Sequence, residues 1–292
     1  MNIKQASAKK GGDMSEFWSK IEDNLVEVVY GSNYIEVTGS NREVTAKLGR
    51  QIFSGKTVPT MIDEKDPEYE EGRTALLEMG RSHTLDDIIR SRQEIINHAD
   101  ALKYAVDYVV LDSKSITEEF IKEVHTRLCA GQVLGEDAGE PGEYRTWEIA
   151  ARHGVKKKSV FIRSSTVSAY MKQLVSDIQE DMASTEHTHV TDPFDLASRY
   201  CHRLICIHPF GDGNGRMCRI LLNILLLKYE GYLSTFGGND AEREEYLDLA
   251  RRANKKFHEE DMEIPEDKKK GHRELARFAL RKSKKTLENM GA

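Results

Sequence analysis

The nine residues from His208 to Arg216, HPFGDGNGR, combine side chains suited to acid–base chemistry with side chains suited to anion binding. A histidine accepts or releases protons near neutral pH, because its unperturbed pKa is about 6.5. Three glycines, among them Gly213 and Gly215, allow the backbone to approach a ligand closely. Arg216 offers several N–H donors to an anion. The stretch therefore predicts a site where a proton moves beside a bound anion.

This stretch lies between two apolar helical patterns, one that begins at Asp192-Pro193 and one at about 216–229. The N–H groups at the start of a helix and the helix dipole both favour an anion. Arg216 and Arg219 project from one side of the second helix, because residues three apart are neighbours on a helix surface. Two guanidiniums beside free N–H groups predict a site for more than one phosphate.

Asp212, in the same loop, would repel an anion unless it holds a cation that bridges phosphates. Mg²⁺ is the hard ion that does so with few protein ligands. A calcium-binding EF-hand is rejected, because an arginine falls at the fifth position of the loop and Asn223 replaces the required bidentate glutamate. The P-loop pattern of nucleotide-binding proteins is absent from the sequence.

The twelve residues His208–Arg219 closely resemble the signature of the Fic family, H-P-F-x-[DE]-G-N-G-R-x-x-R. The segments PGEYR at 141–145 and EIINHADAL at 94–102 also resemble the family, and the likeness covers most of 25–255. The helical patterns already predict a mainly α fold. The resemblance implies a Fic-type helical bundle with a β-hairpin flap.

The resemblance also implies an activity, that of a protein adenylyltransferase, which moves AMP from ATP to a Ser, Thr or Tyr hydroxyl of a target protein. His208 would be the general base, and Asp212 would hold Mg²⁺ or Mn²⁺ on the phosphates. Phe210 would anchor the loop in the core. The backbone of Gly213, Asn214 and Gly215 would form the anion hole. Arg216 and Arg219 would hold the β- and γ-phosphates, and Tyr246 and Asn254 would contact the adenine.

The segment SNYIE, Ser32 to Glu36, resembles the inhibitory motif [ST]-x-x-x-E-[GN] of many Fic proteins. In that motif the glutamate pairs with the second arginine of the signature, here Arg219, and blocks productive ATP binding. Val37 stands where the family has Gly or Asn. The segment TALLE, which ends at Glu78, is an alternative match.

The pattern along the chain predicts five parts. They are a disordered lead at 1–14, N-terminal helices at 15–53 that carry the inhibitory motif, a loop or connector at 54–83, a Fic core at 84–260, and a C-terminal helical tail at 261–292. Two strands, at 144–150 and 158–164, are expected to form the flap.

Composition narrows the class of protein. The net charge of −6 argues against general nucleic-acid binding, which needs a basic surface. The first residues lack the apolar region of a signal peptide, and the longest apolar run, at 220–227, is too short to span a membrane. We therefore expect a cytoplasmic protein. Its oligomeric state stays open, with a homodimer as one alternative.

Other activities stay open at this point. A Fic enzyme of the same fold could transfer UMP or phosphocholine, or remove AMP. A catalytically silent nucleotide-binding regulator is a rival from another class, although the intact His208 argues against it. The target protein and the modified residue type are not readable from the sequence.

Overall fold

The structure, a computed structural model, describes residues 14–132, 139–153, 157–260, 263–265 and 268–289. The expected disordered lead lies outside the described residues except for Met14, which begins the first helix. The helices of the described part are α2 (Met14–Ile35), α3 (Arg42–Phe53), α4 (Pro67–Glu78), α5 (Leu85–Val106), η1 (Asp107–Leu111), α6 (Glu118–Leu128), η2 (Ser164–Thr166), α7 (Val167–Thr188), α8 (Pro193–Ile207), α9 (Asn214–Tyr229), α10 (Asp240–Glu260) and α11 (Arg273–Asn289). The strands are β1 (Ala150–His153) and β2 (Lys157–Val160). The prediction of a mainly α fold is confirmed.

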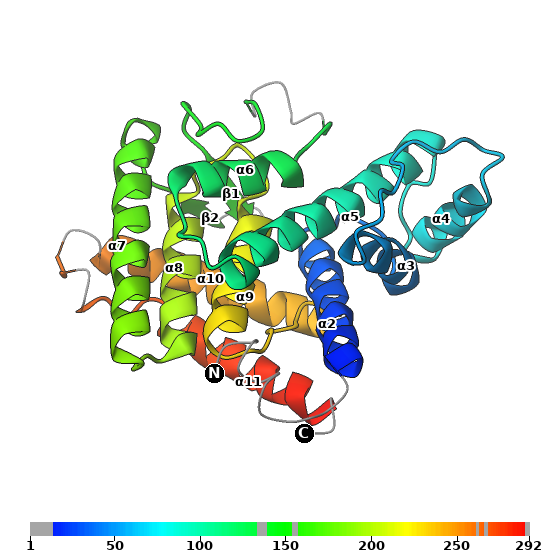
Figure 1. Cartoon of the computed structure of the whole chain (residues 1–292). Helices are drawn as coiled ribbons and strands as arrows, with labels where there is room; N and C mark the ends of the chain where they lie inside the picture. The colour runs from blue at the N-terminus through cyan, green and yellow to red at the C-terminus, as the bar shows by residue number, and fades with distance from the viewer. Residues whose placement is uncertain (1–13, 133–138, 154–156, 261–262, 266–267, 290–292) are drawn as a thin grey trace.

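Helix α9 lies at the centre of the bundle (Figure 1). Its residues from 216 to 227 are all buried, whichever side of the helix they are on. A helix that is buried all round must be surrounded by other helices, and α8, α5, α6 and α2 pack against it. The start of α9, which carries the glycine-rich stretch, is therefore held inside the molecule.

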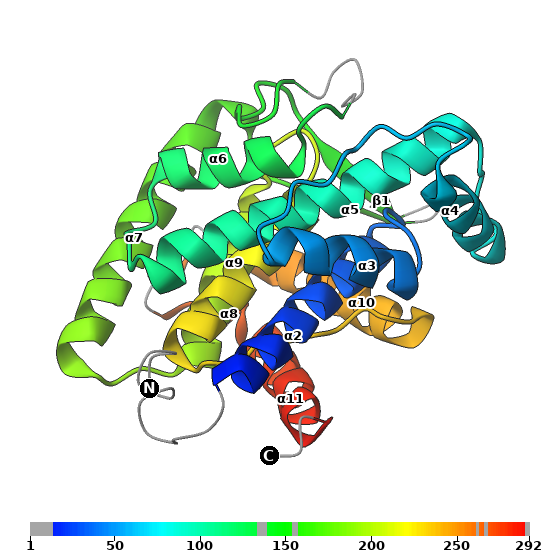
Figure 2. The same ribbon diagram turned by 45° about the vertical axis from the view of Figure 1, so that its right-hand side comes forward.

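Helix α2 brings the N-terminal segment onto this core (Figure 2). Its apolar stripe, which includes Leu25, Val28 and Val29, is buried against α3, α5 and α9. Helix α3 begins where the Asn41 side chain accepts a hydrogen bond from the Val44 N–H, a standard N-cap. The C-terminal end of α2, with the SNYIE segment, consequently points at the beginning of α9.

The expectation of a loop over 54–83 is wrong for Pro67–Glu78, which form α4. Asp66 caps this helix and Pro67 occupies its first turn. Asp followed by Pro is a helix start signal, and the same pair at Asp192 and Pro193 begins α8. The prolines and charges of this segment do not indicate a loop, because a proline breaks a helix only in its interior and Pro67 lies in the first turn.

The flap is a two-stranded antiparallel hairpin, as expected, but its strands are shorter and shifted. Ala150 pairs with Val160 and His153 with Lys157. The predicted strand at 144–150 is wrong up to residue 149, because that segment bonds to the glycine-rich loop instead of to a partner strand. The Arg145 N–H donates to the Pro209 carbonyl oxygen at 2.8 Å.

The C-terminal tail contains α11, which packs on α8 and α10. In the part of the chain that the structure describes, no helix combines the length and the apolar character needed to cross a membrane.

The position of α2 depends on a close approach at Gly31. A Cβ atom there would lie 2.1 Å from the carbonyl oxygen of Phe236, a backbone atom that cannot move aside easily. We expect Gly31→Ala to lower the free energy of unfolding by about 1–3 kcal/mol, as overpacked sites do. Thermal and urea unfolding would measure this.

Gly49→Ala in α3 is the matched control, because its added Cβ would meet only side-chain atoms, a methyl of Val26 at 3.2 Å and the Phe53 ring at 3.7 Å. Alanine also has the higher helix propensity. Equal stability of Gly31→Ala and the unmodified protein would contradict this account of how α2 is positioned.

Candidate active site

A cleft of about 680 Å³, including its open mouth, lies where α2, α8, α9, α10 and the flap meet. Six of the predicted site residues line it: Glu36, His208, Gly215, Arg219, Tyr246 and Asn254. Its walls also include apolar side chains such as Phe161 and Leu247. A concave site with apolar walls and a few converging polar groups is typical of small-molecule binding.

His208 follows the last residue of α8 and has φ = 53°, a left-handed conformation that is rare outside glycine. Its ring stacks on Phe161, with the ring centroids 3.8 Å apart. Its Nδ1 lies 3.3 Å from the carbonyl oxygen of Ile205. Because a carbonyl only accepts, the proton sits on Nδ1, and Nε2 keeps a free lone pair.

The charge state of His208 is set by its surroundings. Burial lowers the pKa of His208 to about 4, more than the Ile205 carbonyl raises it. The imidazole is consequently neutral at pH 7 and can accept a proton at Nε2. An imidazole with a fixed tautomer is prepared for general base chemistry.

Arg145 holds the backbone around His208, a role that the sequence analysis missed. The side chain is 1% exposed, and its guanidinium donates to the carbonyl oxygens of His208 at 2.7 Å and Ile162 at 2.6 Å. It also reaches the Ile207 oxygen at 3.3 Å. It thus provides donors for the carbonyl oxygens at the end of α8 and ties the flap to the loop. Nothing in the local sequence marks an arginine for burial.

The loop between α8 and α9 is closed by Asn214. Its amide oxygen accepts from the Phe210 N–H at 3.0 Å, and its amide nitrogen donates to the Phe210 oxygen at 2.8 Å. Phe210 itself is fully buried, in agreement with its expected anchoring role. The side chain of Asn214 therefore shapes the loop, and only its backbone is free for a ligand.

Gly213 occupies the N-cap position of α9 with φ = 73° and offers no capping side chain. The first N–H groups of a helix have no partner inside the helix. The Gly213 N–H donates to the Asp212 carboxylate at 2.6 Å. The start of α9 thus already accommodates one negatively charged oxygen, that of the neighbouring Asp212.

Arg219 is the most enclosed charge of the cleft, with its side chain 2% exposed. It donates to Glu36 Oε1 at 2.5 Å, to the Ser32 hydroxyl at 2.7 Å and to the Ser32 carbonyl oxygen at 3.1 Å. Burial is the largest influence and opposes its charge, but Glu36, Tyr246 and Cys218 together raise the pKa of Arg219. Glu36 therefore acts as the counter-ion of this guanidinium.

The alternative, Glu78, is exposed at the end of α4, a helix that packs on α3 and α5. Its side chain does not line the cleft. Of the two matches to the inhibitory motif, the geometry favours the one that ends at Glu36.

Val37, where the family has Gly or Asn, adopts φ = 58°. This left-handed conformation ends α2, and its side chain is exposed. A branched Cβ in this region is strained by roughly 1–2 kcal/mol. The turn is nevertheless held in place, because the Gly39 N–H donates to Glu94 at 2.6 Å and the Gly39 oxygen accepts from Ser91 at 2.7 Å.

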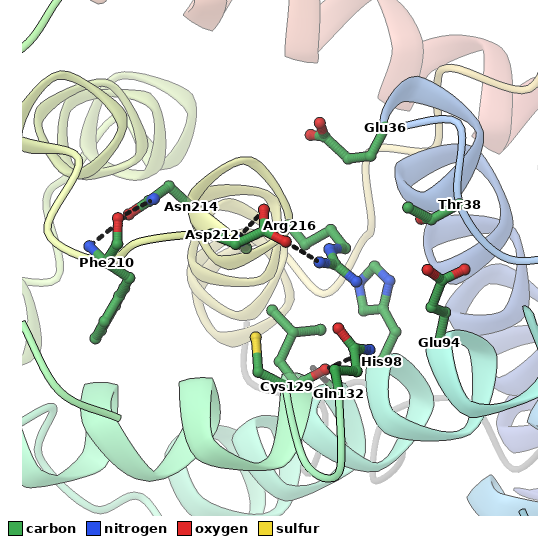
Figure 3. Close-up of polar contacts among 12 residues, drawn as sticks. Glu36, Thr38, Glu94, His98, Cys129, Gln132, Phe210, Asp212, Asn214 and Arg216 are labelled. Atoms are coloured by element: carbon green, nitrogen blue, oxygen red, sulfur yellow. Dashed lines mark hydrogen bonds and ion pairs between the residues drawn. The ribbon is translucent and has the colours of Figure 1, made fainter. Parts of the chain in front are cut away.

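Arg216 does not line the cleft but is buried below the loop. Its closest acid is Asp212, at 3.7 Å, and its Nε and Nη1 have no hydrogen-bond partner in the described part of the chain. In Figure 3 its guanidinium lies between Asp212 and the ring of His98. Burial, together with the charge of Arg216, keeps the pKa of His98 well below its usual range. A buried cation with free donors is costly unless a ligand completes it.

Helix α10 supplies the remaining predicted contacts. The Tyr246 ring is buried, with the Arg219 guanidinium 5.4 Å from its centroid. Asn254 donates to the Val160 oxygen of the flap at 3.3 Å. His258, which the sequence analysis did not single out, also bonds to that oxygen, at 2.7 Å. Helix α10 is thus attached to the flap at two successive turns.

The sequence pattern of the Fic/DOC family matches residues 115–226, from just before α6 to near the end of α9. The chain is 28% identical over 171 residues to protein adenylyltransferase Fic of Nematostella vectensis, covering 54% of this chain and 35% of that protein. It is 31% identical over 143 residues to protein adenylyltransferase fic-1 of Caenorhabditis elegans, covering 48% of this chain and 25% of that protein. The chain thus spans about a quarter to a third of the length of these curated relatives.

A solved structure of a Fic-domain-containing signalling protein from Bacteroides thetaiotaomicron is similar over 99% of this chain and 97% of its own, with a TM-score of 0.62 and 20% identity. At this identity the likeness concerns the fold. The matched segment contains the complete stretch from His208 to Arg219. Residues 115–226 of this chain therefore match the Fic/DOC family, and the whole chain has a fold similar to that of a Fic-domain-containing protein.

Proposed function

We propose that this protein is a protein adenylyltransferase that transfers AMP from ATP to a hydroxyl side chain of a target protein. One observation carries the proposal: the neutral imidazole of His208 and the buried guanidinium of Arg219 line the same cleft, where Arg219 already binds a carboxylate. A base and an anion site that share one cleft support transfer of a phosphate-linked group. The names of the curated relatives support AMP as that group.

In the proposed reaction, the target hydroxyl oxygen attacks the α-phosphorus of ATP. A new oxygen–phosphorus bond forms, the bond between the α-phosphorus and the bridging oxygen breaks, and pyrophosphate leaves. His208 accepts the hydroxyl proton at Nε2, the nitrogen that carries no proton. The N–H groups at the start of α9 would stabilise the charge on the phosphate oxygens.

The two arginines would hold the β- and γ-phosphates. Arg219 would exchange the Glu36 carboxylate for phosphate oxygens, and the Nε and Nη1 donors of Arg216 have no partner among the described residues. Tyr246 and Leu247 would contact the adenine from the apolar wall, with Asn254 as the polar partner.

Asp212 would hold Mg²⁺. Among the described residues, no group of three His, Cys, Asp or Glu side chains is arranged as a metal site. A single exposed carboxylate still fits Mg²⁺, which commonly binds one or two carboxylates together with substrate phosphates. When bound, the ion would neutralise phosphate charge in the transition state.

Glu36 would restrain the enzyme. Its carboxylate would compete with a phosphate for Arg219, since the Nη2 that donates to Glu36 would also donate to a phosphate oxygen. Release of Glu36 would open the anion site, so the proposed activity depends on how often the end of α2 leaves the cleft.

The first prediction concerns the transfer itself. Glu36→Gly protein incubated with Mg²⁺ and α-labelled ATP should label itself or lysate proteins at least about tenfold faster than the unmodified protein, which corresponds to about 1.4 kcal/mol of competition. Glu36→Gln, which keeps the shape but not the charge, should be intermediate. Mass spectrometry should find added adenylyl groups.

His208→Ala in the Glu36→Gly protein is the matched control. Removal of the base should reduce transfer by about 10²–10⁴-fold while ATP binding persists. Absence of label from Glu36→Gly protein would refute the proposed function, and equal rates with and without Glu36 would refute the inhibition.

A second prediction concerns Val37. Val37→Gly should relieve the left-handed strain, hold Glu36 more firmly in the cleft and lower the basal transfer rate about fivefold, for roughly 1 kcal/mol. Val37→Ala, which retains a Cβ, should have a smaller effect. In a Glu36→Gly background the Val37 substitutions should change nothing, and an effect there would contradict this explanation.

A third prediction concerns the charge of His208. In NMR spectra of ¹⁵N-histidine-labelled protein, the His208 signal, assigned by its loss in His208→Ala, should stay neutral from pH 7 to pH 5.5, with its proton on Nδ1. Its pKa of about 4 places protonation below that range, whereas an unperturbed imidazole titrates near 6.5. Titration near 6.5 would show that burial does not set the state of the base.

A further inference from the structure

His125, on α6, joins two segments that are distant in the sequence. Its side chain is 1% exposed, and its Nδ1 accepts a hydrogen bond from the Gly142 N–H at 2.8 Å. Its Nε2 lies 3.0 Å from the Asp212 carbonyl oxygen and 3.5 Å from the Cys129 sulfur. Gly142 belongs to the segment before the flap, and Asp212 belongs to the glycine-rich loop.

These partners determine the tautomer of His125. A backbone N–H can only donate, so Nδ1 carries no proton. Nε2 then carries the proton and donates to the Asp212 oxygen. Burial lowers the pKa of His125 to about 4, so the ring is neutral at pH 7. The ring also stacks on Phe210, with centroids 3.7 Å apart and an angle of 7° between the planes.

The bond to Asp212 has a consequence for the next N–H group. A trans peptide is planar, so its C=O and N–H point in opposite directions. By holding the Asp212 oxygen towards α6, His125 turns the Gly213 N–H away from α6, and that N–H donates to the Asp212 carboxylate at 2.6 Å. It is one of the N–H groups proposed to stabilise the phosphate.

We propose that His125 is a positioning residue of the transfer site, which aims the Gly213 N–H at the α-phosphate through the Asp212 carbonyl and locks the segment before the flap to the same loop. This inference rests on the proposed function, because the phosphate is the group that the N–H would meet.

Three substitutions separate the contacts of the imidazole. His125→Gln can keep a donor near the position of Nε2, His125→Asn can keep an acceptor near the position of Nδ1, and His125→Phe keeps only the stacked ring. Each is made in Glu36→Gly protein and assayed for kcat and for the KM of ATP, below the melting temperature of the least stable variant.

If His125 positions the N–H, His125→Phe and His125→Asn should lose about 10–100-fold in kcat, the range for a displaced transition-state donor. The KM of ATP should change less than about threefold, and His125→Gln should retain most of kcat. If the ring only packs, His125→Phe should be the most active variant and His125→Gln the least. That order would overturn the proposal.

Two readouts do not require turnover. ¹⁵N NMR of the histidines at pH 7 should give a neutral His125 protonated on Nε2, and a proton on Nδ1 would overturn the proposal. Calorimetric titration with a non-transferable α,β-methylene ATP analogue should show binding by Glu36→Gly protein and by all three variants. An inactive Glu36→Gly parent would refute the proposed function, whereas the tautomer would still decide the geometry of His125.

Discussion

The buried guanidinium of Arg219 is the constraint around which the cleft is organised. A cation that is 2% exposed needs a counter-charge, because an uncompensated buried charge costs several kcal/mol. The end of α2 provides one through Glu36 and adds the Ser32 oxygens. The contact joins residues 183 positions apart, so it couples the N-terminal helices to the core. In the proposed inhibition, the order of the α2 terminus and the occupancy of the anion site would therefore be one equilibrium.

The helices could be predicted from sequence because their apolar stripes are long and their caps are local. The candidate site could be proposed from sequence because three of the residues that line the cleft, His208, Gly215 and Arg219, fall in one contiguous stretch. The side chains that hold the loop in place could not be predicted, since Arg145 and His125 reach it from 63 and 87 residues away. A hydrogen bond between distant segments leaves no periodic signal in the sequence. Helix α4 was missed because charge and proline outweighed a correct start signal at Asp66. The left-handed conformation of Val37 runs against its local preference, and tertiary bonds to Gly39 impose it.

The loop from His208 to Gly213 has little secondary structure of its own, and it is shaped from outside. Arg145 binds its first carbonyl, Asn214 closes its middle and His125 binds its penultimate carbonyl. Each of these bonds involves a buried side chain, so breaking one would leave a buried polar group without its partner. In the proposed reaction this order matters, because a base and an anion hole are effective only when their geometry is fixed before the substrate arrives.

Inhibition and catalysis, as proposed, would share the same atoms. The Glu36 oxygen lies 2.1 Å from the point where a Cβ of residue 215 would be, so Gly215 leaves room for the glutamate as it would for a phosphate. Arg219 would bind either anion. A substitution at Gly215 or Arg219 would therefore impair the enzyme together with its restraint. Glu36 and Val37 belong to the turn that ends α2 and have no role in the proposed chemistry. If the proposal holds, the strength of the restraint could thus be adjusted at the end of α2 while the chemistry at α9 stays unchanged, which would give a physical reason for this chain to tolerate a strained valine where a glycine would fit better.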